Sequence, residues 1–174
     1  MIEEEIMKIM NQIEYGFLDE NGFNIINNTE KWDNEFYQFY YLLSPDELLE
    51  KKVGVCWDQV ELERKLFNNH NVEVETYFIY AENRDELPSH TFLIYKKNNK
   101  FYWFEHSWNR YKGIHEYDSL KKLLIDVRDK FMISNNILDV NLVYIYKYEK
   151  PPYHIKCDNF YKYCEGQEYI ELKE

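Results

Sequence analysis

The feature that most constrains this chain is a pair of aromatic, strand-like runs separated by a tight turn signal. The first run is Ser89-His-Thr-Phe-Leu-Ile-Tyr95 and the second is Lys100-Phe-Tyr-Trp-Phe-Glu-His106. Asn98 and Asn99 lie between them, and Asn tolerates the positive φ that a two-residue hairpin turn needs. The pattern therefore predicts an antiparallel hairpin that closes at these two residues.

The register of this hairpin decides which side chains meet. With a two-residue loop, His90 falls opposite Ser107. Side chains alternate between the two faces, so Glu105 shares the side of His90 as a diagonal neighbour, about 7–8 Å away. His106 then points to the other face. A three-residue loop would invert the parity and bring His106 beside His90; we take the two-residue loop as the working register.

A cysteine stands where a helix is expected to start. Ser44-Pro45-Asp46-Glu47 carries the signals of an earlier helix start, and we expect that helix to end near Gly54. A second amphipathic run begins at Cys56. A cysteine in the first turn of a helix lies at the positive end of the helix dipole, beside N–H groups without partners, and both favour a thiolate. The alternative is a buried and inert thiol.

Together these positions predict a cysteine, a histidine and a carboxylate that act as one group. Cys56 would attack a carbonyl carbon, His90 would take and return the proton, and Glu105 would orient the imidazole ring. A Cys-His-carboxylate site performs acyl transfer through a thioester. Nothing in these residues selects water or an amine as the acceptor.

The same residues resemble a known family. Gly54-Val-Cys-Trp-Asp58, then His90 before an aromatic strand, then Trp103-Phe-Glu-His-Ser-Trp108 are similar to the transglutaminase-like superfamily of papain-type cysteine enzymes. The resemblance covers residues 44–110. It implies a papain/transglutaminase-like core, with Cys56 as nucleophile, His90 as general base and Glu105 as orienting acid. The family usually has Asp at the third position.

Other readings of the site remain open. Arylamine acetyltransferases share the order of residues, but their Arg-Gly-Gly segment is absent here. Papain-like cell-wall amidases usually carry secretion signals or wall-binding repeats, which this chain does not show. A transglutaminase-like domain without activity, acting as a protein-interaction module, is the alternative from a different class.

Further residues are candidates for the lining of the site. The backbone N–H of Cys56 is the first candidate for stabilising an oxyanion, and the indole of Trp57 is a second candidate, with core packing as its alternative. Trp108 opens a loop, residues 108–115, that is expected to cross the mouth of the site. Asn109 could hydrogen-bond in the cleft or serve the turn.

The rest of the chain predicts an α+β fold in which the active-site helix packs on a mainly antiparallel sheet. We expect one domain over residues 1–174, with a helical part to about 54, a helix-plus-sheet core over about 55–150 and a short extension over 151–174. The expected helices are 2–15, 30–43 and one capped at Asp118 or Ser119. The other expected strands are 23–26, 72–80, 141–148 and an edge strand at 168–172.

Composition limits the classes of partner that the chain is expected to bind. A net charge of −11 argues against nucleic acid, which needs clustered Lys and Arg. An acidic N-terminus and the lack of an 18-residue apolar run predict no signal peptide and no membrane segment, hence a cytoplasmic protein. The expected partner is a peptide or protein substrate, and the oligomeric state stays open.

The cysteine content also limits cofactor chemistry. The chain has three cysteines, Cys56, Cys157 and Cys164. Because this number is small and odd, a disulfide framework is not expected. His154, Cys157 and Cys164 lack the paired spacing of structural zinc sites, so no metal site is expected. No other cofactor is expected either.

Overall fold

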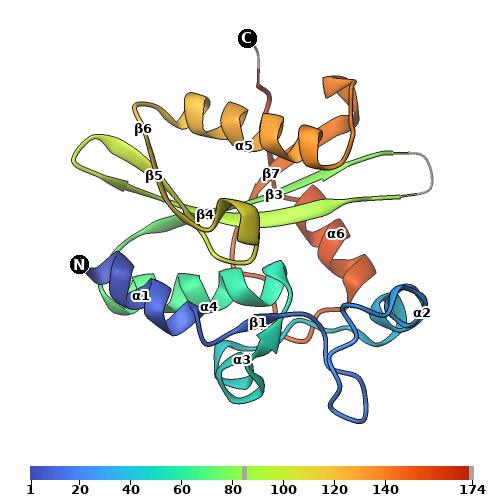
Figure 1. Ribbon diagram of the computed structural model, residues 1–174. Coiled ribbons are helices and arrows are strands. Elements are labelled where there is room, and N and C mark those ends of the chain that lie inside the picture. The colour runs from blue at the N-terminus through green and yellow to red at the C-terminus, as the bar shows by residue number, and fades with distance from the viewer. Residues whose placement is uncertain (84–85, 173–174) are drawn as a thin grey trace.

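Helices lie on both sides of an antiparallel sheet in the computed structural model, which describes residues 1–83 and 86–172 (Figure 1). The strand order in the sheet is β6-β5-β4-β3-β7-β8, and each neighbouring pair is antiparallel. The expected α+β class is therefore confirmed. The strands are β3 (Val74–Ala81), β4 (Ser89–Lys97), β5 (Lys100–Glu105), β6 (Gly113–Tyr117), β7 (Val143–Tyr148) and β8 (Glu168–Tyr169).

The hairpin of β4 and β5 has the predicted two-residue loop. Lys97 pairs with Lys100, and Asn98 and Asn99 adopt φ values of 53° and 63°. Positive φ at both central residues matches the twist that a tight hairpin requires. The working register is thus confirmed.

The two faces of the sheet carry different helices. Helix α5 (Leu120–Ser134) covers one face, and α4 (Cys56–Asn69) with α1 (Ile2–Met10) covers the other (Figure 1). Alternation along the strands supplies apolar side chains to both layers. Toward α5 these include Phe92, Ile94 and Trp103, and toward α4 they include Leu93, Tyr95 and Phe104.

The helix before the cysteine begins as predicted but ends differently. In α3 (Pro45–Lys51), Ser44 and Glu47 form a reciprocal capping box. The helix ends at Lys51, three residues before Gly54, and its C-cap residue Lys52 has a left-handed φ of 60°. Gly54 lies in β2 (Val53–Gly54), where an added Cβ would stand 2.6 Å from the Leu48 side chain. A larger residue there would force the Leu48 side chain to shift.

Pairing with distant segments explains why other boundaries differ from the expected ones. The first helix stops at Met10, because β1 (Glu14–Tyr15) pairs in parallel with β2. The expected helix over 30–43 is α2 (Thr29–Phe39), since residues 40–43 are extended and bond to residues 154–156. No strand forms over 23–26, where an isolated bridge joins Leu18 and Asn24.

The C-terminal third of the chain also departs from expectation in places. The loop expected over 108–115 ends earlier, because β6 pairs with β5. The strand expected over 141–148 begins at Val143, after a 3₁₀ turn, η2 (Val140–Leu142). The edge strand is shorter than 168–172 but pairs with β7. Helix α6 (Cys157–Glu165) was not predicted. Among the described residues, no helix is both long and apolar enough to cross a membrane.

Candidate active site

Cys56 is the first residue of α4, and only 6% of its surface is exposed. The segment before it is fixed by Asp58, whose Oδ2 accepts a hydrogen bond of 2.9 Å from the backbone N–H of Val55. The other carboxylate oxygen accepts from Tyr40 Oη and from the N–H of Leu43. Burial raises the pKa of Asp58 to about 7. Asp58 therefore holds the helix start in place, as its position in the first turn suggests.

His90 and Glu105 meet as the register requires. His90 Nε2 lies 2.5 Å from Glu105 Oε1, and both side chains are buried. Three more donors surround the carboxylate: Trp103 Nε1 at 3.3 Å, Ser107 Oγ at 3.3 Å and the backbone N–H of Trp108 at 3.0 Å. With its oxygens fully engaged, the carboxylate has one orientation, and it fixes the plane of the imidazole ring.

The environment of His90 favours an imidazolium. Burial alone would disfavour the charge, but the Glu105 carboxylate and a hydrogen bond with Cys56 outweigh it and raise the pKa of His90 to about 10. Since Nε2 is engaged by Glu105, Nδ1 is the ring nitrogen left to face Cys56. The ring therefore stands beside the Cys56 sulfur at the N-terminus of α4.

His106 lies on the opposite face and does not reach His90. Its Nδ1 lies 2.6 Å from Gln59 Oε1, while Gln59 Nε2 donates to the carbonyl of Gly54 at 2.9 Å. Burial lowers the pKa of His106 to about 4, with a smaller contribution from the charge of Lys112. The neutral ring therefore donates from Nδ1, and the chain of bonds ties the end of β5 to the peptide just before Cys56.

Two cavities adjoin the Cys56–His90 pair. One, of about 170 Å³, is lined by Cys56 and by aromatic residues of α2 and α6. The other, of about 240 Å³, is lined by His90, Ser107 and Trp108. Tyr15 and Ser89 line both cavities, so they stand where the thiol side meets the imidazole side.

The three residues expected to line the site have different positions. The Trp108 ring packs edge-on to His90 with 5.1 Å between ring centroids. Trp57 stacks on Phe160 at 4.3 Å within an aromatic cluster, and its buried Nε1 has no hydrogen-bond partner among the described residues. Asn109 is exposed in the 3₁₀ turn η1 (Asn109–Tyr111) and lines neither cavity. The structure therefore brings Trp108 and Trp57 to the site but not Asn109.

Two residues near the site were not anticipated. Tyr15 arrives through the parallel pairing of β1 with β2, which no local pattern indicates. Partial burial and the negative charges of Cys56, Asp58 and Glu105 raise the pKa of its phenol, so the hydroxyl keeps its proton.

Glu63 is 2% exposed, and burial with the nearby charge of Glu105 raises the pKa of its carboxyl well above the usual range. Its position two turns after Cys56 on α4 was a usable signal.

The other cysteines are buried and unpaired. Burial raises the pKa of the Cys157 thiol to about 12, and it raises the pKa of Cys164 as well. Within residues 1–83 and 86–172, no group of three or more His, Cys, Asp or Glu side chains is arranged to hold a metal ion.

A family model described as a transglutaminase-like domain matches residues 3–125, which is more than half of the chain and includes Cys56, His90 and Glu105. No curated protein matches the sequence. The family match accords with the helix start, the hairpin and the three side chains that they position. The chain therefore belongs to the transglutaminase-like domain family.

Proposed function

We propose that this protein is a cysteine-dependent acyl-transfer enzyme that acts on an amide or peptide through a thioester. The observation that carries the proposal is the His90 ring, held at 2.5 Å by a fully bonded Glu105 and hydrogen-bonded to Cys56. Glu105 is the negative partner of this ring, and the ring in turn stands beside the Cys56 sulfur, where it can take and return a proton. An inert packing role for the cysteine would not require this arrangement.

The proposed first step is attack of the Cys56 thiolate on the amide carbonyl carbon. A carbon–sulfur bond forms and the carbonyl electrons move to oxygen. The backbone N–H of Cys56, in the first turn of α4, stabilises this oxyanion, and the phenol of Tyr15 is a second donor at the junction of the two cavities. Trp57 would serve as a wall, since its ring is held in the aromatic cluster.

The second step is loss of the amine. The imidazolium of His90 gives its proton to the leaving nitrogen as the carbon–nitrogen bond breaks, and a thioester on Cys56 remains. Water or a second amine then attacks the thioester, while His90 takes its proton and the thiolate leaves. Glu105 keeps the ring oriented throughout and is a positioning residue.

Thiol reactivity tests this proposal without a known substrate. We expect iodoacetamide to label Cys56 ahead of Cys157 and Cys164, with a rate that is already high at pH 6.5. His90→Ala should lower that rate by about 100-fold, the thiolate fraction expected of an ordinary cysteine near pKa 8.5 at this pH. Peptide mass spectrometry locates the label at each pH.

The matched control is His70→Ala, which removes an exposed histidine at the end of α4. It should leave the labelling of Cys56 unchanged. If Cys56 in the unaltered protein reacts no faster than a free thiol, or if His90→Ala has no effect, the enzyme proposal is rejected. The alternative of an interaction module without activity would then be preferred.

A further inference from the structure

A third cavity is lined by residues 16–20, which directly follow Tyr15 in the chain. Its volume is about 390 Å³, larger than either cavity beside the Cys56–His90 pair. None of Cys56, His90 and Glu105 lines it. It is therefore separate from the site of the proposed acyl transfer.

The walls of this cavity are apolar and largely aromatic. Phe17 comes from the N-terminal segment, Phe39 from α2, and Tyr40 and Tyr41 from the extended stretch that follows α2. Aromatic faces carry partial negative charge and attract cations. The Lys51 ammonium shows this within the cavity, since it lies 5.5 Å from the centre of the Tyr41 ring.

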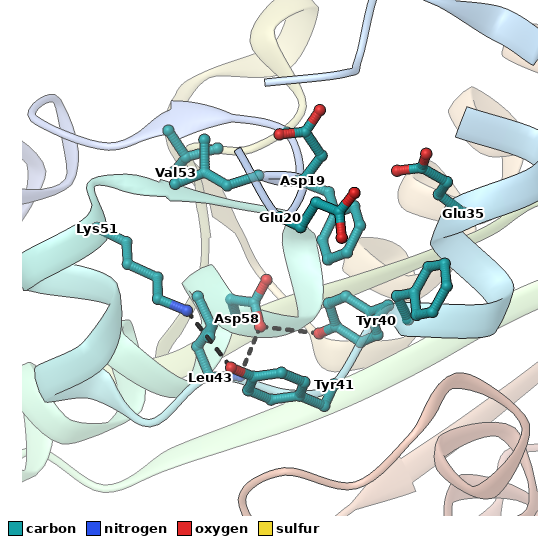
Figure 2. A pocket seen from close by; sticks show the side chains of 13 residues that line it. Asp19, Glu20, Glu35, Tyr40, Tyr41, Leu43, Lys51, Val53 and Asp58 are labelled. Atoms are coloured by element: carbon teal, nitrogen blue, oxygen red, sulfur yellow. Dashed lines mark hydrogen bonds between the residues drawn. The ribbon is translucent and has the colours of Figure 1, made fainter. Parts of the chain in front are cut away.

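Carboxylates stand at one side of the cavity. Figure 2 shows Glu35 reaching from α2 toward Glu20 and Asp19. Asp19 already pairs with Lys31. In the part of the chain that the structure describes, Glu20 and Glu35 make no ion pair, although Lys31 lies near enough to feel their charge. Neither of these two described carboxylates beside the aromatic walls is thus held in an ion pair.

The carboxylate at the floor of the cavity already has hydrogen-bond partners. Asp58 lines it, but its oxygens accept hydrogen bonds from Tyr40 and Leu43 (Figure 2) and from the backbone N–H of Val55. Lys51 is the cation that lines the cavity, and it lies 3.5 Å from Tyr41 Oη on the side away from Glu35. The chemistry left for a ligand is therefore a positive group near Glu20 and Glu35 and an apolar body against the rings.

We propose that this cavity binds an ammonium group carried on an apolar stem, with Glu20 and Glu35 receiving the ammonium and the aromatic walls receiving the stem. Both a free primary amine and a lysine side chain of a peptide have this chemistry. The inference goes beyond the proposed acyl transfer, because binding here does not involve the thiol and can be measured without turnover.

The test is binding of phenethylamine compared with 2-phenylethanol, a neutral molecule of nearly the same shape. Ligand-observed NMR titration of the full chain at low ionic strength measures both affinities. We expect the amine to bind at least tenfold more tightly than the alcohol, with the difference shrinking at high salt as the charges are screened. A capped lysine, N-acetyl-lysine N-methylamide, run beside them distinguishes a peptide side chain from a free amine as the source.

Two variants are expected to change the affinity for phenethylamine in opposite directions. Glu35→Gln should weaken phenethylamine binding at least fivefold, whereas Lys51→Gln should strengthen it, because it removes a like charge. Glu30→Gln is the matched control, since Glu30 lies in the first turn of the same helix but does not line the cavity. Binding of the alcohol should be unaffected by Glu35→Gln.

Several outcomes would overturn the proposal. These are equal affinity for the alcohol and the amine, an unchanged affinity in Glu35→Gln, an equal loss in Glu30→Gln, or no detectable binding of either amine. All of these readouts are independent of Cys56. Fast alkylation of Cys56 with no amine binding would reject the inference alone, while amine binding with an unreactive Cys56 would reject only the proposed enzyme function.

Discussion

Glu105 shows how a single longer side chain is accommodated at the site. A Glu reaches one methylene further than the Asp that this family usually has, so its carboxylate needs more support to hold one position. The structure supplies that support from β5 and the turn after it, through Trp103, Ser107 and the N–H of Trp108. The contact with His90 at 2.5 Å is the result. Neighbours on β5 and in the turn after it therefore hold this longer side chain in one position.

Tyr15 is the residue whose proposed role is tested most directly. Tyr15→Phe removes the hydroxyl and keeps the ring, so the oxyanion loses one donor while the thiolate–imidazolium pair is untouched. We expect hydrolysis of an activated ester such as p-nitrophenyl acetate to fall by about 10²-fold, the usual effect of losing one such donor. The rate of iodoacetamide labelling should stay within about twofold, because alkylation forms no oxyanion. Equal losses in both assays would instead indicate a structural role.

Glu63 predicts a specific dependence of stability on pH. Its pKa is higher in the folded chain than in the unfolded one, so the folded chain binds the extra proton. Its contribution to stability is therefore present at low pH and is lost as the pH rises above about 4.3, the unfolded value. Glu63→Gln keeps the shape and has no proton to lose. The free energy of unfolding of the variant, relative to that of the unaltered protein, should therefore increase by up to about 1.4 kcal/mol for each unit of rising pH.

Urea unfolding at pH 5, 6, 7 and 8 measures this difference. Glu50→Gln, on the exposed side of α3, is the control and should show the same pH dependence as the unaltered protein. A difference between Glu63→Gln and the unaltered protein that stays constant over this range would mean that Glu63 does not hold a proton in the folded chain.

At the scale of elements, short-range signals were predictable and distant pairings were not. The capping box at Ser44, the start of α4 at Cys56 and the Asn98-Asn99 turn each depend on neighbours within a few residues. They sufficed to place Cys56, His90 and Glu105. The short β1–β2 pair depends on a partner 39 residues away along the chain, from Glu14 to Val53, and the sequence carries no local sign of it. Tyr15 was missed for this reason.

The β4–β5 turn gives a prediction that separates local backbone strain from packing. Asn99 has a φ of 63°, a region that costs most residues about 1–2 kcal/mol and that Gly adopts freely. Asn99→Ala should therefore lower the free energy of unfolding by about 1 kcal/mol, while Asn99→Gly should leave it unchanged or raise it. In an ordinary strand or helix position Ala is the more stable of the two. Thermal unfolding of both variants is the measurement, and a more stable Ala variant would contradict the assigned turn.

The whole molecule extends beyond the region that matches the family. The match ends at residue 125, yet β7 pairs with β3 along its length, and α6 packs against the aromatic side chains around Trp57. Without these elements, β3 would become an open edge and Trp57 would lose its stacking partner. We propose on this basis that the described residues fold as one cooperative unit, as expected for a single domain over residues 1–174.

Phe160 tests that cooperation from the far end of the chain. It is fully buried in α6, stacked on Trp57 and edge-on to Tyr148 and Phe78. Phe160→Ala should lower the free energy of unfolding by about 3–5 kcal/mol, because the cavity it leaves is closed on all sides. Phe39→Ala, at a ring that is 53% exposed, should cost much less.

If the chain is one unit, tryptophan fluorescence and far-UV circular dichroism should report the same single transition in denaturant, and Phe160→Ala should shift both midpoints together. The rate of iodoacetamide labelling of Cys56 should also change in Phe160→Ala, because Trp57, which then loses its stacking partner, directly follows Cys56 in α4. Two separate transitions, of which only one moves in Phe160→Ala, would show that α6 is an appendage. The site would then depend on α4 and the β4–β5 hairpin alone, and the C-terminal segment could be removed without loss of thiol reactivity.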